Sequence, residues 1–308
     1  MMRIAAAPSR YLLVVAALTV AACARESWPE PPAVDQAAYQ KEHAAWRQEE
    51  QRLIADVLPI VGIWALDAGE TPFGTDTTLP IALPAAAGAA RGGVFRRAGD
   101  DVTVRAAPGV TLRGADGGLL ADGAGFGFGE PVVAGSIELI RGSGADGRVY
   151  VTARDLTHPA VKAAPDPPVY ALDPAWRVSA RFDAFATPKV MKIADVRGGM
   201  SERLASGELV FQLNGRERRL VVLEGGEEFF LMFKDATNGS TTYGGYRMLF
   251  PKTVANGEFT VLDFNFAVNP PCAYSSFTTC PLPPRENTLD LAVEAGLKQL
   301  PSVKGWSG

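Results

Sequence analysis

The chain has 308 residues, of which 47% are apolar and 21% are charged, a balance that excludes disorder throughout. Its formal net charge of -4, without a basic block, argues against a protein that follows a nucleic-acid backbone, so we expect no nucleic-acid partner. The 32 glycines and 23 prolines predict many turns between short strands.

The N-terminal segment has the features of a secretory signal. Arg3 and Arg10 come before an apolar run that is too short to cross ~30 Å of hydrocarbon comfortably. The small residues directly before Cys23 resemble the lipobox of bacterial lipoproteins, in which that cysteine receives a diacylglycerol and becomes the N-terminus. We therefore expect residues 1–22 to be a lipoprotein signal peptide and Cys23 to be lipidated. An ordinary signal peptide with an incidental cysteine is the alternative.

The residues after Cys23 bear on the location of the protein. By resemblance to lipoproteins, Ala24 and Arg25 lack the aspartate that would favour retention in the inner membrane. We expect a lipid-anchored protein of the cell envelope, at the periplasmic face of the outer membrane in a host with two membranes. Residues 23–34 contain three prolines and predict an extended tether.

One long amphipathic helix is expected over residues 35–58. Asp35 can cap its N-terminus and Pro59 ends it. His43 has no second metal ligand nearby, so no metal role is expected for it. The predicted apolar face consists of residues at helical spacing: Tyr39, Trp46, Leu53 and Val57. The opposite face is expected to be exposed to solvent: Lys41, Arg47, Gln48 and Gln51.

After the helix the pattern changes to short β-branched and aromatic runs separated by Gly, Pro and Asp. The runs predict a first β unit over 59–155 and a second over 176–308, joined by a proline-rich connector over 156–175. Dipeptides such as Asn214-Gly215 favour hairpins. The expected fold class is therefore all-β, a mainly antiparallel meander forming a barrel or a sandwich, with one N-terminal helix.

Polar residues that could bind a ligand gather in three clusters of the second β unit. The candidate ligand-binding residues are Asp235, Asn238, Tyr243, Arg247, Asp263, Asn265, Asn269, Glu286 and Asn287. An expected strand over 259–266 would place Asp263 and Asn265 on one face, where they could meet Arg247 from a neighbouring strand. An Asp–Arg pair beside amides suits a structural network as well as a ligand site, and both interpretations stay open.

Cys272 and Cys280 are the only cysteines after Cys23. Outside the cytoplasm, two cysteines eight positions apart are best explained by a disulfide, which would contribute roughly 2.5 kcal/mol in the chain-entropy view. The alternatives are a thiol pair on a metal and a catalytic cysteine. Both are weaker because the chain has two histidines, neither of them close in sequence.

Several phrases of the second unit resemble the family called domain of unknown function 1684. They are Phe233-Lys234-Asp235-Ala236-Thr237-Asn238-Gly239, Tyr243-Gly244-Gly245-Tyr246-Arg247, Asp263-Phe264-Asn265, Asn269-Pro270-Pro271-Cys272-Ala273-Tyr274 and Cys280-Pro281-Leu282-Pro283-Pro284-Arg285-Glu286-Asn287. Tyr246 departs from the pattern, which has a glycine or another small residue there. The resemblance implies a shared architecture and a shared site without naming a reaction.

No familiar catalytic motif is present, whether a Gly-x-Ser-x-Gly elbow, a His-Glu-x-x-His or a phosphate-binding loop. The first hypothesis is a non-enzymatic envelope lipoprotein that binds a small molecule or an envelope protein, with no cofactor and no metal. The alternative is an envelope hydrolase that uses a carboxylate pair from Asp235, Asp263 and Glu286.

Overall fold

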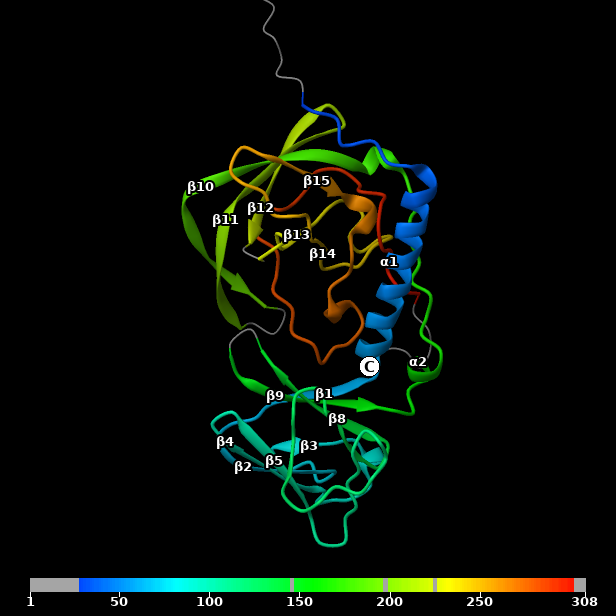
Figure 1. Cartoon of the computed structure of the whole chain (residues 1–308), viewed down its shortest axis with the longest axis vertical. Coiled ribbons are helices and arrows are strands. Elements are labelled where there is room, and N and C mark those ends of the chain that lie inside the picture. The colour runs from blue at the N-terminus through cyan, green and yellow to red at the C-terminus, as the bar shows by residue number, and fades with distance from the viewer. Residues whose placement is uncertain (1–27, 145–146, 196–198, 224–225, 302–308) are drawn as a thin grey trace, which may run out of the picture.

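The computed structural model describes residues 28–144, 147–195, 199–223 and 226–301. The described chain is mainly antiparallel β, with one long helix near its N-terminal end, so the expected fold class is confirmed. In Figure 1 the strands form two units, and helix α1 runs along the side of the unit that contains β10 to β15. The expected signal peptide and Cys23 lie outside the described residues.

Helix α1 spans Gln36–Val57, with the Asp35 side chain accepting a hydrogen bond from the Ala38 N–H at its N-terminus. The buried residues of α1 are Tyr39, His43, Glu50 and Ile54. Leu53 is 49% exposed, so its predicted place on the apolar face is wrong. The face of α1 that contacts the second unit follows the 3.6-residue period in steps of four and three: Tyr39, His43, Trp46, Glu50, Ile54 and Val57. None of the described helices is long and apolar enough to cross a membrane.

On the face of α1 that is expected to be exposed, Lys41 and Gln48 are exposed, whereas Arg47 and Gln51 contact the connector. Arg47 donates to the Pro167 carbonyl and pairs with Asp166, while Gln51 donates to the Ala164 carbonyl. Hydrophobic periodicity identifies a buried face by its apolar residues. It does not predict this contact, because polar side chains make it through hydrogen bonds. The connector itself contains the short helix α2, Pro159–Lys162, and the 3-10 turn η2, Pro174–Trp176.

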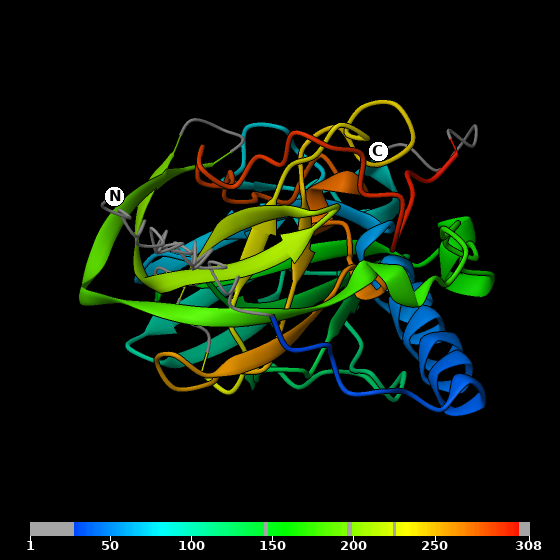
Figure 2. The ribbon, with the colours of Figure 1, turned by 90° about the horizontal axis from the view of Figure 1, so that it is seen from above.

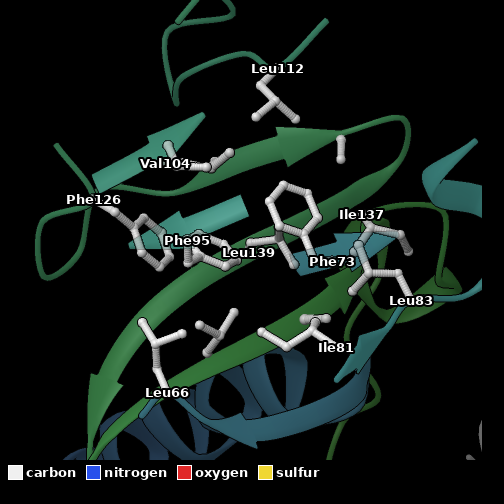
Figure 3. Packing of buried hydrophobic residues seen from close by; sticks show 14 of the residues in the cluster. Leu66, Phe73, Ile81, Leu83, Phe95, Val104, Leu112, Phe126, Ile137 and Leu139 are labelled. Carbon is white, nitrogen blue, oxygen red and sulfur yellow. The ribbon is translucent and has the colours of Figure 1, made fainter. Parts of the chain in front are cut away.

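The first β unit contains two sheets around one core. Its strands are β1 (Ile60–Ala65), β2 (Gly69–Gly74), β3 (Ile81–Ala82), β4 (Gly93–Ala98), β5 (Asp101–Ala106), β6 (Ala124–Gly125), β7 (Val132–Ala134), β8 (Ile137–Ser143) and β9 (Val149–Asp155), with a 3-10 turn η1 at Ala85–Ala87. The sheet orders are β1-β9-β8-β7 and β3-β2-β4-β5-β6, and among the described strands of this unit only β2 and β3 pair in parallel. Figure 3 shows Phe73, Phe95 and Phe126 in line at the centre, with ring centroids 4.8 and 4.9 Å apart.

The second β unit is built on two long antiparallel strands. Its strands are β10 (Arg177–Ala194), β11 (Met200–Leu213), β12 (Arg216–Leu223), β13 (Leu231–Phe233), β14 (Arg247–Leu249) and β15 (Phe259–Asp263). The larger sheet has the open order β12-β11-β10-β15, and β13 pairs with β14. Seen from above in Figure 2, the long strands curve around the segments that follow them. Asn214 and Gly215, at φ 53° and 70°, form the expected hairpin turn between β11 and β12.

The strand expected over 259–266 ends at Asp263, and the 3-10 turn η3, Phe264–Phe266, follows it. The Asp263 carboxylate accepts the Asn265 N–H and caps this turn, which is the physical reason for the break. A short capping side chain thus overrides the apolar alternation around it. Strand β14 is likewise short and covers only Arg247–Leu249.

Part of the expected tether lies against the second unit. Residues 28–34 form no helix or strand. The Trp28 ring contacts the Phe259 ring edge-on at 5.5 Å and lies under the Arg181 guanidinium, and Arg177 donates to the Pro32 carbonyl. These contacts fix the direction in which the chain enters α1.

Candidate functional site

Arg247 and Asp235, two of the predicted ligand-binding residues, form a completely buried ion pair. The guanidinium Nη2 lies 2.7 Å from Asp235 Oδ2, and both side chains are 0% exposed. The same guanidinium donates to the carbonyls of Val293 and Ala295. Burial lowers the pKa of Arg247, and the Asp235 carboxylate opposes that effect.

The rest of the Asp235 carboxylate is also occupied. Its Oδ1 accepts hydrogen bonds from the Thr237 N–H, the Thr237 hydroxyl and the Val293 N–H. Arg247 therefore binds Asp235 and the backbone of the C-terminal segment. The predicted meeting of Arg247 with Asp263 does not occur, because β14 pairs with β13 whereas β15 pairs with β10. The Asp235–Arg247 pair thus holds the C-terminal segment at Val293 and Ala295 against the second unit, and we call this arrangement the structural clamp.

Asn238 and Asn287 also bind backbone. Asn238 accepts from the Asp235 N–H at 2.7 Å and donates to the Tyr243 carbonyl at 2.6 Å. Asn287 is 0% exposed, accepts from the Val221 N–H, and donates to the carbonyls of Val221 and Met232. Its neighbour Glu286 is exposed, so adjacent predicted site residues have different surroundings.

Asn265 and Asn269 are also buried, and Asn265 bonds to α1. The Asn265 amide donates to the Tyr39 hydroxyl at 3.0 Å and to the Asp173 carbonyl at 2.8 Å. Asn269 donates to the Tyr274 hydroxyl at 3.2 Å and to the Lys298 carbonyl at 3.0 Å, but its buried Oδ1 has no hydrogen-bond partner among the described residues. Asn265 thereby ties the helix to the second unit.

Asp263 is the predicted residue that reaches an open cleft. The Tyr39 hydroxyl donates to its Oδ2 at 2.6 Å, and the Arg177 Nε lies 3.7 Å from the same oxygen. Burial raises the pKa of Tyr39, and the Asp263 hydrogen bond and charge add to the rise. Asp263 thus anchors α1 and at the same time forms part of the cleft wall.

The cleft lies between α1 and the β14–β15 side of the second unit and has a volume of about 510 Å³. Its aromatic residues are Tyr39, Trp46, Phe250 and Phe266. Its charged residues are Glu42, Glu50, Arg177, Glu228, Lys252 and Asp263. A volume of this order, with apolar walls and a few converging polar groups, is typical of small-molecule sites.

Glu50 differs from the other charged residues of this cleft because it combines burial with the lack of a bonding partner among the described residues. Its side chain is only 8% exposed, and within the described residues it forms no hydrogen bond or ion pair. Burial raises the pKa of Glu50 to about 7, and the neighbouring charge of Glu49 adds to the rise. A buried carboxyl group without a partner is costly, and a shifted pKa in a cleft is typical of functional sites.

Glu50 is not among the residues predicted from the sequence, because all the predicted ligand-binding residues lie in the polar clusters of the second unit. The signal was present in the helix, where Glu50 lies four residues after Trp46 and four before Ile54. That spacing puts a carboxyl group on the apolar face. His43, on the same face, packs against Trp46 and Phe266, and burial lowers the pKa of its imidazole.

A second recess, of about 710 Å³, lies on the other side of α1 against the connector. Its lining includes Arg47, Gln51 and Asp166. Arg47 pairs with Asp166, and Gln51 donates a hydrogen bond to the connector. It contains no buried carboxyl group comparable with Glu50. We therefore take the cleft at Glu50 as the candidate site.

Cys272 and Cys280 are separate thiols in the structure, and the expected disulfide between them is not formed there. Closing it requires the loss of two electrons and two protons, so it stays a prediction for the oxidised protein. The Cys272 N–H donates to the Cys280 Sγ at 3.2 Å, and the Tyr243 hydroxyl donates to the Cys272 Sγ at 3.7 Å. The described part of the chain contains no group of three or more His, Cys, Asp or Glu side chains that could hold a metal ion.

These features define a class of protein: an antiparallel β protein whose N-terminal helix borders a cleft with a nearly buried carboxyl group that has no partner among the described residues. The chain belongs to the family described as "Protein of unknown function (DUF1684)", which matches residues 166–298, so the resemblance noted in the sequence is confirmed. The matched region includes β10 to β15 and both body cysteines, whereas α1 and Glu50 precede it.

Among solved structures, the chain is similar to an uncharacterized protein of Haloarcula marismortui that was determined in solution by NMR. The two share 31% identity over 44% of this chain and 76% of that chain, with a TM-score of 0.38. No curated protein matches the chain.

Proposed function

We propose that this protein is a lipid-anchored lipoprotein of the cell envelope that binds a small molecule in the cleft between α1 and the second β unit. One observation carries the binding proposal: Glu50 lies in the cleft wall, nearly buried and without a partner among the described residues. A protein keeps such a group when a ligand or a reaction compensates for its cost.

The cleft chemistry supports a ligand that is partly apolar and carries an amine or another hydrogen-bond donor. Glu42, Glu50, Glu228 and Asp263 give the lining four carboxyl groups, against the two cations Arg177 and Lys252. Arg177 is already engaged by the Pro32 carbonyl and by Asp263. Trp46, Phe250 and Phe266 offer ring faces for the apolar part, and such faces also attract cations.

The proposed anchor sets how far the body can move from the membrane. Trp28 is held against Phe259 and Arg181, so only residues 24–27 separate it from Cys23. Five Cα steps span at most roughly 18 Å. A lipid on Cys23 would therefore hold the second unit close to the membrane surface of the envelope.

The binding proposal is tested by native mass spectrometry of the full protein isolated from its own host. The wild type and Glu49→Gln are expected to retain the same small molecule, whereas Glu50→Gln is expected to lose most of it. Glu49 is the matched control because its side chain is 55% exposed and pairs with Arg52. A wild type that carries no molecule, or a Glu50→Gln variant that retains it fully, would contradict the proposal.

Acid–base catalysis in the same cleft is the second candidate, favoured by the pKa of Glu50 near neutrality. The carboxylate pair expected from the sequence does not support it, because Asp235 is clamped by Arg247 and Glu286 is exposed. Of the three carboxyl groups expected from the sequence, Asp263 does line the cleft with Glu50, as do Glu42 and Glu228. Turnover of the retained molecule by the wild type, lost in Glu50→Gln, would favour this candidate over binding alone.

A further inference from the structure

A second chemical centre lies around Cys272 and Cys280, neither of which lines the cleft at Glu50. Cys272 belongs to the 3-10 turn η4, Pro271–Ala273, and Cys280 follows eight residues later. The Cys280 Sγ accepts the Cys272 N–H at 3.2 Å, so the two residues are already in direct contact. Pro270, Pro271 and Pro281 restrict the backbone of this loop.

The two thiols differ in access. Cys272 is half-buried, whereas Cys280 is 3% exposed and packs with Met232 and Tyr246. An external reagent therefore reaches Cys272 first. Such an arrangement, one accessible sulfur with a protected sulfur behind it, is the geometry of an attacking and a resolving thiol.

Hydrogen-bond donors surround the accessible sulfur. The Cys280 thiol and the Tyr243 hydroxyl donate to the Cys272 sulfur, and the first of these is the largest cause that lowers the pKa of Cys272 to about 7. The same contact, together with burial, raises the pKa of Cys280. Cys272 is therefore substantially ionised at neutral pH, while Cys280 keeps its proton.

Tyr246 adds a buried hydroxyl to this centre. It is 1% exposed, and its hydroxyl makes no hydrogen bond of ordinary geometry within the described residues. It packs in the same cluster as both cysteines, and burial, followed by the charge of a nearby thiolate, raises its pKa. A thiolate on Cys280 would give this hydroxyl an acceptor.

We propose that Cys272 and Cys280 form a thiol–disulfide exchange site, in which Cys272 attacks a low-molecular-weight disulfide and Cys280 resolves the product. In the first step the Cys272 thiolate forms a bond to one sulfur of that disulfide, whose S–S bond breaks and releases one thiolate. In the second step Cys280 loses its proton to water and attacks the Cys272 sulfur. The Cys272–Cys280 disulfide forms, the second thiolate leaves, and the external disulfide has accepted two electrons.

The proposal concerns a separate site and does not depend on the ligand cleft. It also differs from a permanent structural disulfide, because exchange runs in both directions in the folded protein. Tyr243 is a positioning residue, since it acts on the Cys272 sulfur and not on the external disulfide.

The experiment treats the reduced, folded mature protein with oxidised glutathione and follows each cysteine by peptide mass mapping, with Cys23 followed separately. The wild type is expected to become two hydrogens lighter and to retain no glutathione. Cys280→Ser is expected to hold one glutathione on Cys272, and Cys272→Ser to react at least tenfold more slowly. Reduced glutathione is expected to regenerate both thiols of the wild type without unfolding it.

The pH profile adds a readout that a structural role would not move. The alkylation rate of Cys272 by iodoacetamide is expected to rise with a midpoint near pH 7, and Tyr243→Phe is expected to shift this midpoint upward. The matched control, Tyr150→Phe, lies in the first β unit and is expected to leave the midpoint unchanged. Equal alkylation of both cysteines, or a disulfide that glutathione cannot open in the folded protein, would overturn the proposal.

Discussion

Arg247→Lys separates a structural clamp from a ligand site. The Arg247 guanidinium donates to Asp235, Val293 and Ala295 from a position that is 0% exposed. A lysine ammonium is a single point, so it cannot reach these three acceptors in the geometry of the planar fork. Losing about two buried charge-assisted bonds costs roughly 3 kcal/mol.

The assay is urea unfolding of the mature protein, followed by circular dichroism and tryptophan fluorescence, alongside thermal unfolding. A loss of roughly 3 kcal/mol corresponds to a fall in Tm of roughly 6–12 °C for a chain of this size. Arg216→Lys is the matched control, because Arg216 and Asp290 are 73% and 63% exposed and lie 3.8 Å apart. This control is expected to change stability by less than about 0.5 kcal/mol. An Arg247→Lys variant with a stability change below about 1 kcal/mol would refute the clamp.

Three further predictions each concern a single residue. Asn287→Ala leaves the N–H and carbonyl of Val221 and the Met232 carbonyl without their partner, so unfolding free energy should fall by roughly 3 kcal/mol in urea titrations; an unchanged midpoint would contradict the buried bonds. The Glu50 carboxyl keeps its proton up to about pH 7 in the folded protein, but only up to about pH 4.5 in the unfolded chain. The free energy of unfolding should therefore be highest below pH 4.5 and fall by up to about 3 kcal/mol as pH rises from there through 7. Glu50→Gln should remove that slope and be the more stable protein at pH 8, which unfolding at several pH values checks. Cys23→Ala should move the protein to the aqueous phase or leave it uncleaved, and unchanged partitioning into detergent would contradict lipidation.

The N-terminal helix α1 shows which features of the fold can be predicted from the sequence and which cannot. Its limits could be predicted within a residue, because Asp35 is a strong N-cap and Pro59 cannot continue a helix. Its buried face could not be derived from apolar residues alone, since Glu50 and His43 occupy it while Leu53 is exposed. Burial of polar residues depends on the partner surface, which a single helix pattern does not contain.

The candidate site shows the same limit. The polar cluster on the expected strand over 259–266 predicts Asp263 as a site residue, and Asp263 does line the cleft. Arg247 was expected to face it, yet Asp235, twelve residues before Arg247, takes that role. Strand pairing decides which side chains meet, and β14 pairs with β13 through long-range contacts that local periodicity does not encode.

A crystal structure of the protein isolated from its own host, with its bound molecule retained, would show directly whether the cleft binds a ligand. We expect density for a small molecule in the cleft, with a donor group at the Glu50 carboxyl and an apolar part against Trp46 and Phe250. A molecule bound elsewhere, with water alone beside Glu50, would contradict the binding proposal.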